Sequence, residues 1–292
     1  MKSIGFCYSE QAVKVSNSHS SSIQHDSSMA TTNCYIVKLS TGKQFLIKLT
    51  WSKSGFSIAV SEYFPFCPSK KGEKYTLLQS ARGTKCFELK SSKIEVYWDF
   101  CRAKYGSGPE PETGFYVLVL VESEMGLFLG DMEHEKQVVS GIDSAEFKLI
   151  SRCEVFSGYA CYSGRARFCE TGKCHDISIR FDVSRNSSLS VSVDEKSVVE
   201  VKRLRWNFRG NQTIFVDGLL VDLMWDLRDW LFGPLLSSSS SSRLGHGVFL
   251  FRTRSGLDSR LWLEEKKIDV EKDDDQLNVG FSFMICAYKN PD

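Results

Sequence analysis

Apolar and polar residues alternate with a period of two over most of the chain. The clearest alternating segments are CYIVKLS (34–40), KQFLIKLTW (43–51), FSIAVSEY (56–63), KIEVYWDF (93–100), DISIRFDV (176–183), LSVSVD (189–194) and LLVDLMWDL (219–227). Such alternation gives an extended strand one apolar face and one polar face. No segment of ordinary helix length interrupts these runs with a convincing helical pattern. The chain is therefore predicted to be an all-β protein.

Turn residues agree with this prediction. Thr41-Gly42, Gly210-Asn211 and Asp217-Gly218 lie between strand-like runs, where glycine and its Asx neighbours supply the positive φ of tight hairpin turns. Residues 189–226 then read as four strands joined by hairpins, which is an antiparallel meander. The apolar positions change parity between residues 201 and 204, which predicts a β-bulge near Lys202 and Arg203.

Four alternating segments end on a tryptophan, at Trp51, Trp98, Trp206 and Trp225. We expect these four rings to anchor the core, because a buried indole dominates packing wherever a strand leaves a sheet. Two of the segments match further, IEVYWDFCRAKYG (94–106) with VDLMWDLRDWLFG (221–233). The match indicates two related halves, while the uneven spacing of the tryptophans argues against a propeller.

Composition divides the chain into three parts. Residues 1–31 are predicted to be a disordered N-terminal segment, because Ser, Thr, His and Asn dominate it from residue 8 onward. An N-terminal β half (32–141) and a C-terminal β half (142–292) follow, the second with flexible loops at 234–247 and 264–276. The halves are expected to pack as β-sandwiches or as a partly closed β-barrel.

Charge and cysteine content restrict the setting. The 37 basic and 36 acidic residues nearly cancel, so no global field attracts nucleic acid or an anionic membrane. The longest apolar run, 115–121, is too short to span a bilayer, and the N-terminus lacks the apolar core of a signal peptide. We expect a soluble protein of the cytoplasm or nucleus, with its ten cysteines as reduced thiols.

The segment WDFCRAKYGSGPEPETGFYVLVLV (98–121) contains a GxG pattern that invites comparison with a phosphate-binding loop. No third glycine follows at the required spacing, a proline removes a backbone donor, and a strand rather than a helix comes next. The segment is therefore predicted to be a wide hairpin connection. Its exposed charges are candidate binding residues because sites gather on loops held by rigid strands; they are Arg102, Lys104, Glu110 and Glu112.

Metal binding and catalysis find little support. Cys153, Cys161, Cys169, Cys174 and His175 lie within 23 residues, but no CxxC pair is present and cysteine is a common small apolar core residue. Consecutive residues of a strand point to opposite faces, so Cys174-His175-Asp176 cannot form a triad among themselves. We found no GxSxG, HExxH or P-loop motif. No metal, no cofactor and no enzymatic activity are expected.

The stretch KRLRWNFRGN (202–211) is the most basic part of the chain. Strand alternation would send its aromatic residues inward and most of its cations outward, so the rings are not expected to stack on nucleic-acid bases. The simplest interpretation of this basic strand is a solvated face, binding of an acidic protein partner is the next, and binding of nucleic acid is not expected. The candidate binding cations are Lys202, Arg203, Arg205 and Arg209.

Several motifs resemble a plant-specific family catalogued as domain of unknown function 868. They are WDFCRAKYGSGPEPETGFY (98–116), GLFLGD (126–131), GRARF (164–168), KRLRWNFRGN (202–211) and GHGVFLFR (245–252), and the likeness runs from about Cys34 to Tyr288. The resemblance implies membership without mechanism, because the family has no established activity, cofactor or partner. Cys169 and Cys174 fall where the family shows no cysteines, and Asn207 stands where it has lysine.

The expected function is that of a non-enzymatic binding or scaffold protein, which acts on a protein partner through exposed loops and the basic strand. An alternative is a carrier of an apolar small molecule or lipid, since β-barrels enclose cavities that the 20 phenylalanines would line. An enzyme with a dispersed active site is a third hypothesis, because catalytic geometry need not appear in local spacing.

Overall fold

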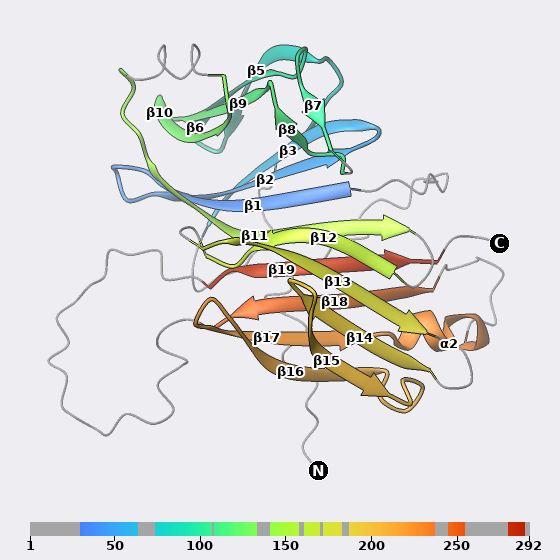
Figure 1. Cartoon of the computed structure of the whole chain (residues 1–292). Coiled ribbons are helices and arrows are strands. Elements are labelled where there is room, and N and C mark those ends of the chain that lie inside the picture. Colours follow the sequence, from blue (N-terminus) through green and yellow to red (C-terminus); the bar gives the residue numbers. More distant parts are fainter. Residues whose placement is uncertain are drawn as a thin grey trace, which may run out of the picture.

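The computed structural model describes residues 30–63, 74–106, 108–132, 141–157, 161–169, 172–182, 187–236, 245–254 and 280–289. The described residues form a long sheet covered by two smaller ones (Figure 1). The long sheet has nine strands, in the spatial order β16 (Arg209–Val216), β17 (Leu219–Asp226), β18 (His246–Thr253), β19 (Ser282–Tyr288), β11 (Glu146–Ser157), β1 (Ala30–Lys38), β2 (Gln44–Ser52), β3 (Gly55–Glu62) and β4 (Lys74–Leu78).

The two smaller sheets have four strands each and cover different ends of the long sheet. The first contains β10 (Glu124–Gly130), β9 (Tyr116–Val121), β6 (Ser92–Asp99) and β5 (Arg82–Leu89). The second contains β12 (Cys161–Arg167), β13 (Cys174–Asp182), β14 (Ser188–Val193) and β15 (Lys196–Lys202). A two-stranded ribbon, β7 (Lys104–Tyr105) with β8 (Pro111–Thr113), lies beside the first.

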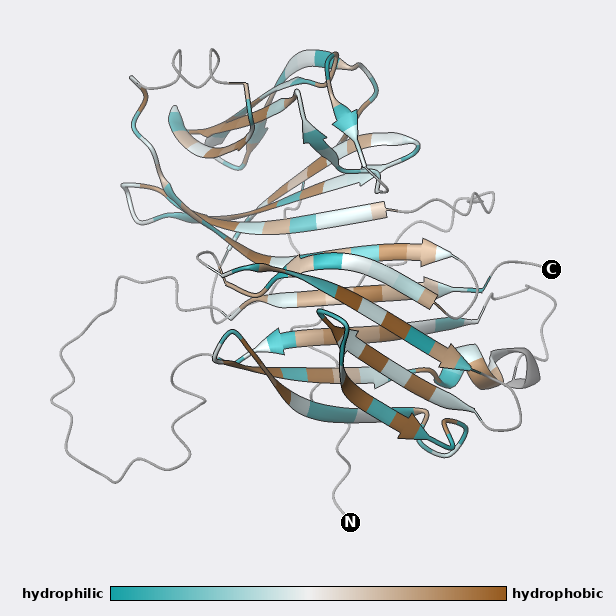
Figure 2. Cartoon of the chain, viewed as in Figure 1, coloured by the Kyte–Doolittle hydropathy of each residue, from teal (hydrophilic) through white to brown (hydrophobic). Residues whose placement is uncertain are grey.

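Each small sheet closes its own hydrophobic core against the long sheet. One core is built on β1–β6, β9 and β10, the other on β11–β19, and the partly buried Leu149 of β11 packs against both. Figure 2 shows the alternation of apolar and polar residues along the strands. The protein is all-β and sandwich-like, and none of its sheets closes into a barrel, which removes the partly closed barrel that the sequence left open. The division into halves at residues 141/142 stays a prediction.

The long sheet joins the two sandwiches through β11. This strand pairs antiparallel with β1 on one side and parallel with β19 on the other. A purely antiparallel arrangement was expected, and the parallel pairing is a difference. It arises because β11 and β19 are far apart in the chain and meet through tertiary contacts, so no hairpin fixes their direction.

The hairpin of β5 and β6 carries a frame of four residues. Gly83 lies opposite Trp98, and Arg82 lies opposite Asp99, with which it forms an ion pair at 3.3 Å. A Cβ on Gly83 would come within 2.7 Å of the Trp98 ring, so glycine is required there for the ring to lie across the neighbouring strand. The Trp98 indole donates to the backbone oxygen of Ser80 at 2.9 Å.

The hairpin of β16 and β17 repeats this frame position by position. Gly210 lies opposite Trp225, and Arg209 lies opposite Asp226, with which it pairs at 2.5 Å. The Trp225 indole donates to the backbone oxygen of Asn207 at 3.0 Å, and donor and acceptor are 18 residues apart in both hairpins. Both hairpins consist of two eight-residue strands. The match of 94–106 with 221–233 in the sequence therefore reflects a structural repeat.

Residues 189–226 do not form the predicted meander. β14 pairs with β15 in the second small sheet, whereas β16 and β17 belong to the long sheet and no pairing joins β15 to β16. Gly210 and Asn211 lie inside β16 rather than in a turn. The chain changes sheets between residues 202 and 209, which local alternation cannot reveal because strands in either sheet alternate alike.

One helix, α2 (Arg228–Leu236), follows β17. The predicted loop at 234–247 is therefore wrong at its edges, since 234–236 belong to this helix and 246–247 begin β18. The predicted disorder of residues 1–31 and the predicted loop at 264–276 lie outside the described residues, except for 30 and 31, which begin β1. No helix in the described part of the chain is long and apolar enough to cross a bilayer.

Candidate functional site

The segment between β6 and β9 is the wide hairpin connection that the sequence predicts. β6 and β9 pair antiparallel, and the ribbon of β7 and β8 folds out between them. Arg102, Lys104 and Glu112 are exposed on this connection, as expected. Gly114 has a φ of +73° and its backbone lies against the carbonyl of Arg102, so it holds the base of the loop in a conformation that glycine favours.

Glu110 is not a free charge of this loop. Its carboxylate accepts hydrogen bonds from the Asn33 amide at 2.8 Å and from the Arg152 guanidinium at 2.5 Å, and about a quarter of the side chain is exposed. The prediction of an exposed binding residue is wrong because the partners lie 77 and 42 residues away, beyond the reach of local patterns. Glu110 fastens the wide loop to β1 and β11.

The polar cluster around Arg152 extends to the second small sheet. The guanidinium also binds Glu154 at 2.8 Å, and Glu154 accepts a hydrogen bond from the Tyr162 hydroxyl of β12 at 2.6 Å. Burial alone would lower the pKa of Arg152, but the carboxylates of Glu110 and Glu154 outweigh it and raise the pKa. Burial, with Glu154 nearby, raises the pKa of Tyr162. These groups satisfy one another and join both sandwiches, which is a structural role.

Residues 203–208 form a turn between β15 and β16 rather than a strand. β15 ends at Lys202, Arg203 has a φ of +54°, and the backbone N–H groups of Trp206 and Asn207 both donate to the carbonyl of Arg203. Leu204 is fully buried. The predicted β-bulge near Lys202 and Arg203 is therefore wrong, because the change in parity marks the end of the strand.

Trp206 is exposed over 84% of its surface, and its predicted role as a core anchor is wrong. The prediction assumed that strand alternation continued to this residue, whereas the turn gives the buried position to Leu204. The other three predicted anchors, Trp51, Trp98 and Trp225, are buried as expected.

The cations of this turn differ in their surroundings. Lys202, Arg203 and Arg205 are exposed, and no ion pair joins them to another described residue. Arg209 is also exposed, but its guanidinium binds Asp226 through two nitrogens at 2.9 and 2.5 Å. The predicted basic surface therefore reduces to three available cations around Trp206. We call residues 202–208 the basic turn.

His175 is the titratable group that sequence reasoning missed. Its ring nitrogens contact the carboxylates of Asp194 at 2.7 Å and Asp217 at 2.9 Å, and the side chain is buried. Burial alone would lower the pKa of His175, but the hydrogen bonds to the two carboxylates raise it above its ordinary value. Asp217 lies in the turn between β16 and β17, so the imidazolium ties the second small sheet to the long sheet. No local signal joins residues 175 and 217.

The cysteines near His175 do not gather around it. Cys161 and Cys174 are exposed, and Cys153 lies on β11 beside Cys286 of β19. Within the described ranges, no group of three or more His, Cys, Asp or Glu side chains is arranged to hold a metal ion. The cysteines of the described residues are free thiols.

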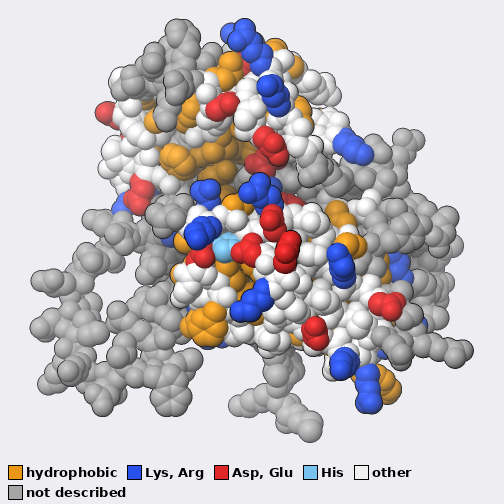
Figure 3. All heavy atoms as spheres, viewed as in Figure 1, with side chains coloured by type: hydrophobic (Ala, Val, Ile, Leu, Met, Phe, Trp, Pro, Cys, Tyr) orange, Lys and Arg blue, Asp and Glu red, His pale blue; other side chains and the backbone are white. Residues whose placement is uncertain are grey.

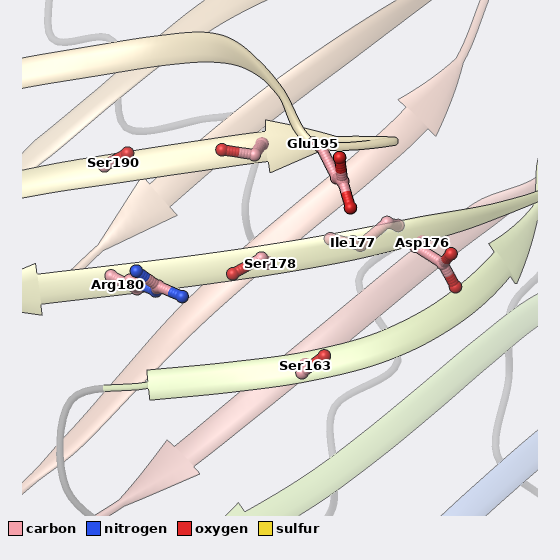
Figure 4. A pocket seen from close by; sticks show the side chains of 8 residues that line it. Ser163, Asp176, Ile177, Ser178, Arg180, Ser190 and Glu195 are labelled. Carbon is pink, nitrogen blue, oxygen red and sulfur yellow. The ribbon is translucent and has the colours of Figure 1, made fainter.

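A polar hollow of about 490 Å³ lies on the outer face of the second small sheet (Figure 4). Ser163, Ser178 and Ser192 align across three strands at its centre, with Arg180 toward one end and Asp176 toward the other. Short side chains on a solvated sheet produce such a trough. None of these side chains is among the buried polar groups that lack a partner in the described residues, so the hollow does not require a ligand.

The two halves present different outer surfaces. Figure 3 shows hydrophobic side chains gathered on the layer of the N-terminal half, and acidic and basic side chains intermixed on that of the C-terminal half. The apolar group lies on the outer face of the first small sheet and consists of Tyr97, Tyr116, Leu118, Leu120, Met125, Phe128 and Ile142.

Comparison with known proteins gives one positive result. A family model described as a plant protein of unknown function (DUF868) matches residues 26–289. No curated protein and no solved structure matches the chain.

Proposed function

The chain belongs to the plant protein family of unknown function DUF868, and on that premise we propose that it is a non-enzymatic binding protein that holds an acidic protein segment on its basic turn. The observation that carries the proposal is the 84% exposure of Trp206 amid three exposed cations. Tryptophan and arginine are the residues that most often dominate the free energy of protein–protein binding. An exposed indole beside them is what a partner would bury.

The basic turn is held rigidly beneath its exposed side chains. The backbone N–H of Leu204 donates to the carbonyl of Ser187 at 2.9 Å, and the Asn207 amide donates to the carbonyl of Lys202 at 2.9 Å. Trp225 of the core donates to the carbonyl of Asn207. A turn fixed in this way loses little backbone entropy when a partner binds, so more of the contact energy appears as affinity.

Charge favours an acidic partner. Lys202, Arg203 and Arg205 lie within four residues, and no carboxylate of the described chain pairs with them. Their field would speed the encounter with a negatively charged segment and orient it over Trp206. The apolar indole would then contact aliphatic or aromatic side chains of that segment. An acidic segment with interspersed apolar residues fits this surface.

A protein partner fits better than nucleic acid. Binding of a single strand requires several aromatic platforms for successive bases, together with a basic groove that follows the backbone. Phe208, the other aromatic residue of the basic turn, is half-buried and packs on Phe232 with ring centroids 5.6 Å apart. Trp206 therefore stands without a second platform in the basic turn.

The proposed location is the cytoplasm or the nucleus. Free thiols persist in the reducing compartments of the cell, and the eight cysteines of the described residues are free. Carriage of an apolar small molecule or lipid, the other function expected from the sequence, stays the alternative proposal, although none of the described sheets closes into the barrel that was to enclose the ligand.

The test is a fluorescence anisotropy titration with a defined probe, a labelled twelve-residue peptide in which glutamate alternates with leucine. We expect binding that weakens as salt rises, since exposed charges are screened. Trp206→Ala and Arg205→Glu should each weaken it about tenfold or more, as expected of central interface residues. The matched control is Phe215→Ala, which removes an aromatic residue exposed over 76% of its surface on β16, the edge strand that follows the basic turn.

Two results would contradict the proposal. The first is equal affinity of the wild type and the Trp206→Ala variant for the peptide. The second is a single-stranded RNA twelve-mer that binds more tightly than the peptide and depends on Trp206, which would assign the surface to nucleic acid.

A further inference from the structure

The two repeated hairpins are followed by the same backbone hydrogen bond. The backbone N–H of Phe100 donates to the carbonyl of Ala81, and that of Leu227 donates to Phe208, with donor and acceptor 19 residues apart in both cases. The chain therefore leaves both hairpins along the same path. In the first half it enters the wide loop, and in the second it enters α2.

In the C-terminal sandwich, α2 fills the end of the core with an aromatic ring. Trp230 is 3% exposed and packs edge-on against Phe181, with ring centroids 4.8 Å apart and planes at 83°. Phe181 is the next-to-last residue of β13, a nine-residue strand. Lys289 places its ammonium 5.6 Å from the Trp230 ring centroid.

In the N-terminal sandwich, the corresponding end is open. Trp51 is the next-to-last residue of β2, also a nine-residue strand. It shares a core with Trp98, as Phe181 shares one with Trp225, and we take the two positions to correspond. No residue of the described wide loop enters as Trp230 does, and a cleft of about 470 Å³ remains. That volume suits a small organic ligand. The apolar walls of the cleft are Trp51, Phe56, Leu78, Phe100, Tyr105 and Pro109.

Trp51, which lines this cleft, carries a buried polar atom that lacks a partner among the described residues. The indole N–H of Trp51 is buried, and no described residue accepts its hydrogen bond. The other two buried strand-end tryptophans, Trp98 and Trp225, both donate to backbone carbonyls. A buried donor without an acceptor costs free energy, which a ligand oxygen placed beside it would recover after a small movement of the wall.

We propose that this cleft binds a small planar aromatic carboxylate, whose ring takes the place that Trp230 fills in the other half. The aromatic walls recognise the ring, because offset and edge-on ring contacts add to the burial of apolar area. The carboxylate accepts the Trp51 N–H and is attracted by Lys53, the single charged residue among the described residues that line the cleft. This site is separate from the basic turn and goes beyond the function proposed above.

The test is isothermal titration calorimetry of the full chain with 2-naphthoate. The structure predicts one site per chain. The neutral 2-naphthamide should bind about fivefold more weakly, because a hydrogen bond to a charged group exceeds one to a neutral group by about that factor. Cyclohexanecarboxylate, which has the charge without the aromatic ring, should also bind more weakly.

Gly108→Trp is the variant that should close the site. A Cβ at Gly108 meets no atom within 4 Å and the residue lines the cleft, so a side chain has room to enter as Trp230 does in the other half. We expect naphthoate affinity to fall tenfold or more, about what direct occlusion of a pocket costs. The matched control is Gly141→Trp, whose Cβ also meets nothing within 4 Å and which does not line the cleft.

Trp51→Phe keeps an aromatic ring and removes the donor, so naphthoate should bind about fivefold more weakly, as for the loss of one hydrogen bond. Absence of naphthoate binding to the folded wild type would overturn the proposal, as would binding that Gly108→Trp leaves unchanged. Neither result bears on the acidic peptide, whose affinity should be the same in Gly108→Trp and the wild type. Failure of this site is thereby distinguished from failure of the basic turn.

Discussion

The hairpins β5–β6 and β16–β17 use one frame and continue differently. Both place a glycine opposite a buried tryptophan and pair an arginine with the aspartate that follows the tryptophan. In both, the indole N–H donates to a carbonyl 18 residues earlier. After the first hairpin the chain enters a wide loop and leaves a cleft, whereas after the second it enters α2 and fills the core. The two hairpins thus share their local geometry, and the segment that follows each one differs.

The two halves also differ in the polar contacts that hold their parts together. In the first half, an ion pair at 2.5 Å between Glu110 and Arg152 joins the wide loop to the long sheet. In the second, His175 joins the layers through an imidazolium between two carboxylates. The second contact should weaken in alkaline solution, because its stabilisation is lost as pH rises through the raised pKa of His175.

The strongest way to break the frame is to remove its tryptophans. Trp98→Ala and Trp225→Ala should each lower the free energy of unfolding by about 3–5 kcal/mol, because each opens a cavity in a closed core. Trp206→Ala should stay within about 0.5 kcal/mol, since the ring is exposed. Urea denaturation of the three variants measures this. A large loss from one of Trp98→Ala and Trp225→Ala with a small loss from the other would contradict the equivalence of the two residues, and Trp206→Ala is the control.

The glycines of the frame should tolerate no side chain. A Cβ would come within 2.7 Å of the Trp98 ring from Gly83, and closer still to the Trp225 ring from Gly210. Gly83→Ala and Gly210→Ala should each cost about 1–3 kcal/mol of overpacking, with the larger loss at Gly210. Thermal unfolding followed by circular dichroism gives the comparison. Gly141→Ala is the control, because its Cβ meets nothing within 4 Å.

The two polar contacts can be compared by substitution. Glu110→Ala should lower the free energy of unfolding by about 1–2 kcal/mol, because it removes an acceptor from Asn33 and Arg152, and partial exposure keeps the loss below that of a fully buried pair. Glu112→Ala, on the same loop and exposed, is the control and should change little. Equal losses from the two variants would show that Glu110 is not the fastening residue of the wide loop.

The His175 contact should give the smallest effect and the one that depends on pH. Its pKa is raised in the folded state, so its stabilisation is fully present below the unfolded value near 6.5 and is lost as pH rises through the folded value. The difference in unfolding free energy between wild type and His175→Gln should be about 1 kcal/mol at pH 6 and shrink toward pH 9. A difference that grows with pH would contradict the assignment, and His246→Gln is the control.

Local patterns predicted the strands and the repeat well. Alternation identified the all-β class, the wide hairpin connection between β6 and β9, and the burial of Trp51, Trp98 and Trp225. These features depend on contacts between neighbouring strands or on the period of a single strand, which a sequence shows directly.

The failures share a physical cause. Trp206 followed the same local pattern as the other tryptophans. However, the chain changes sheets there, so the alternation of buried and exposed positions in β15 does not continue to this residue. Glu110 and His175 find partners 42 residues away, and the parallel pairing of β11 with β19 spans more than a hundred. The open cleft depends on the difference between the wide loop that follows β6 and the helix α2 that follows β17. Such contacts follow from tertiary packing, to which local patterning is blind.

The measurement that tests the account most directly is ¹⁹F NMR of the protein labelled with 5-fluorotryptophan, before and after addition of 2-naphthoate. The chain has six tryptophans, and Trp→Phe variants would assign their signals. If the end of the sandwich is closed in the second half and open in the first, the Trp51 signal shifts when 2-naphthoate is added, while the signals of Trp225 and Trp230 stay in place. An unmoved Trp51 signal, or a shift at Trp230 instead, would contradict it.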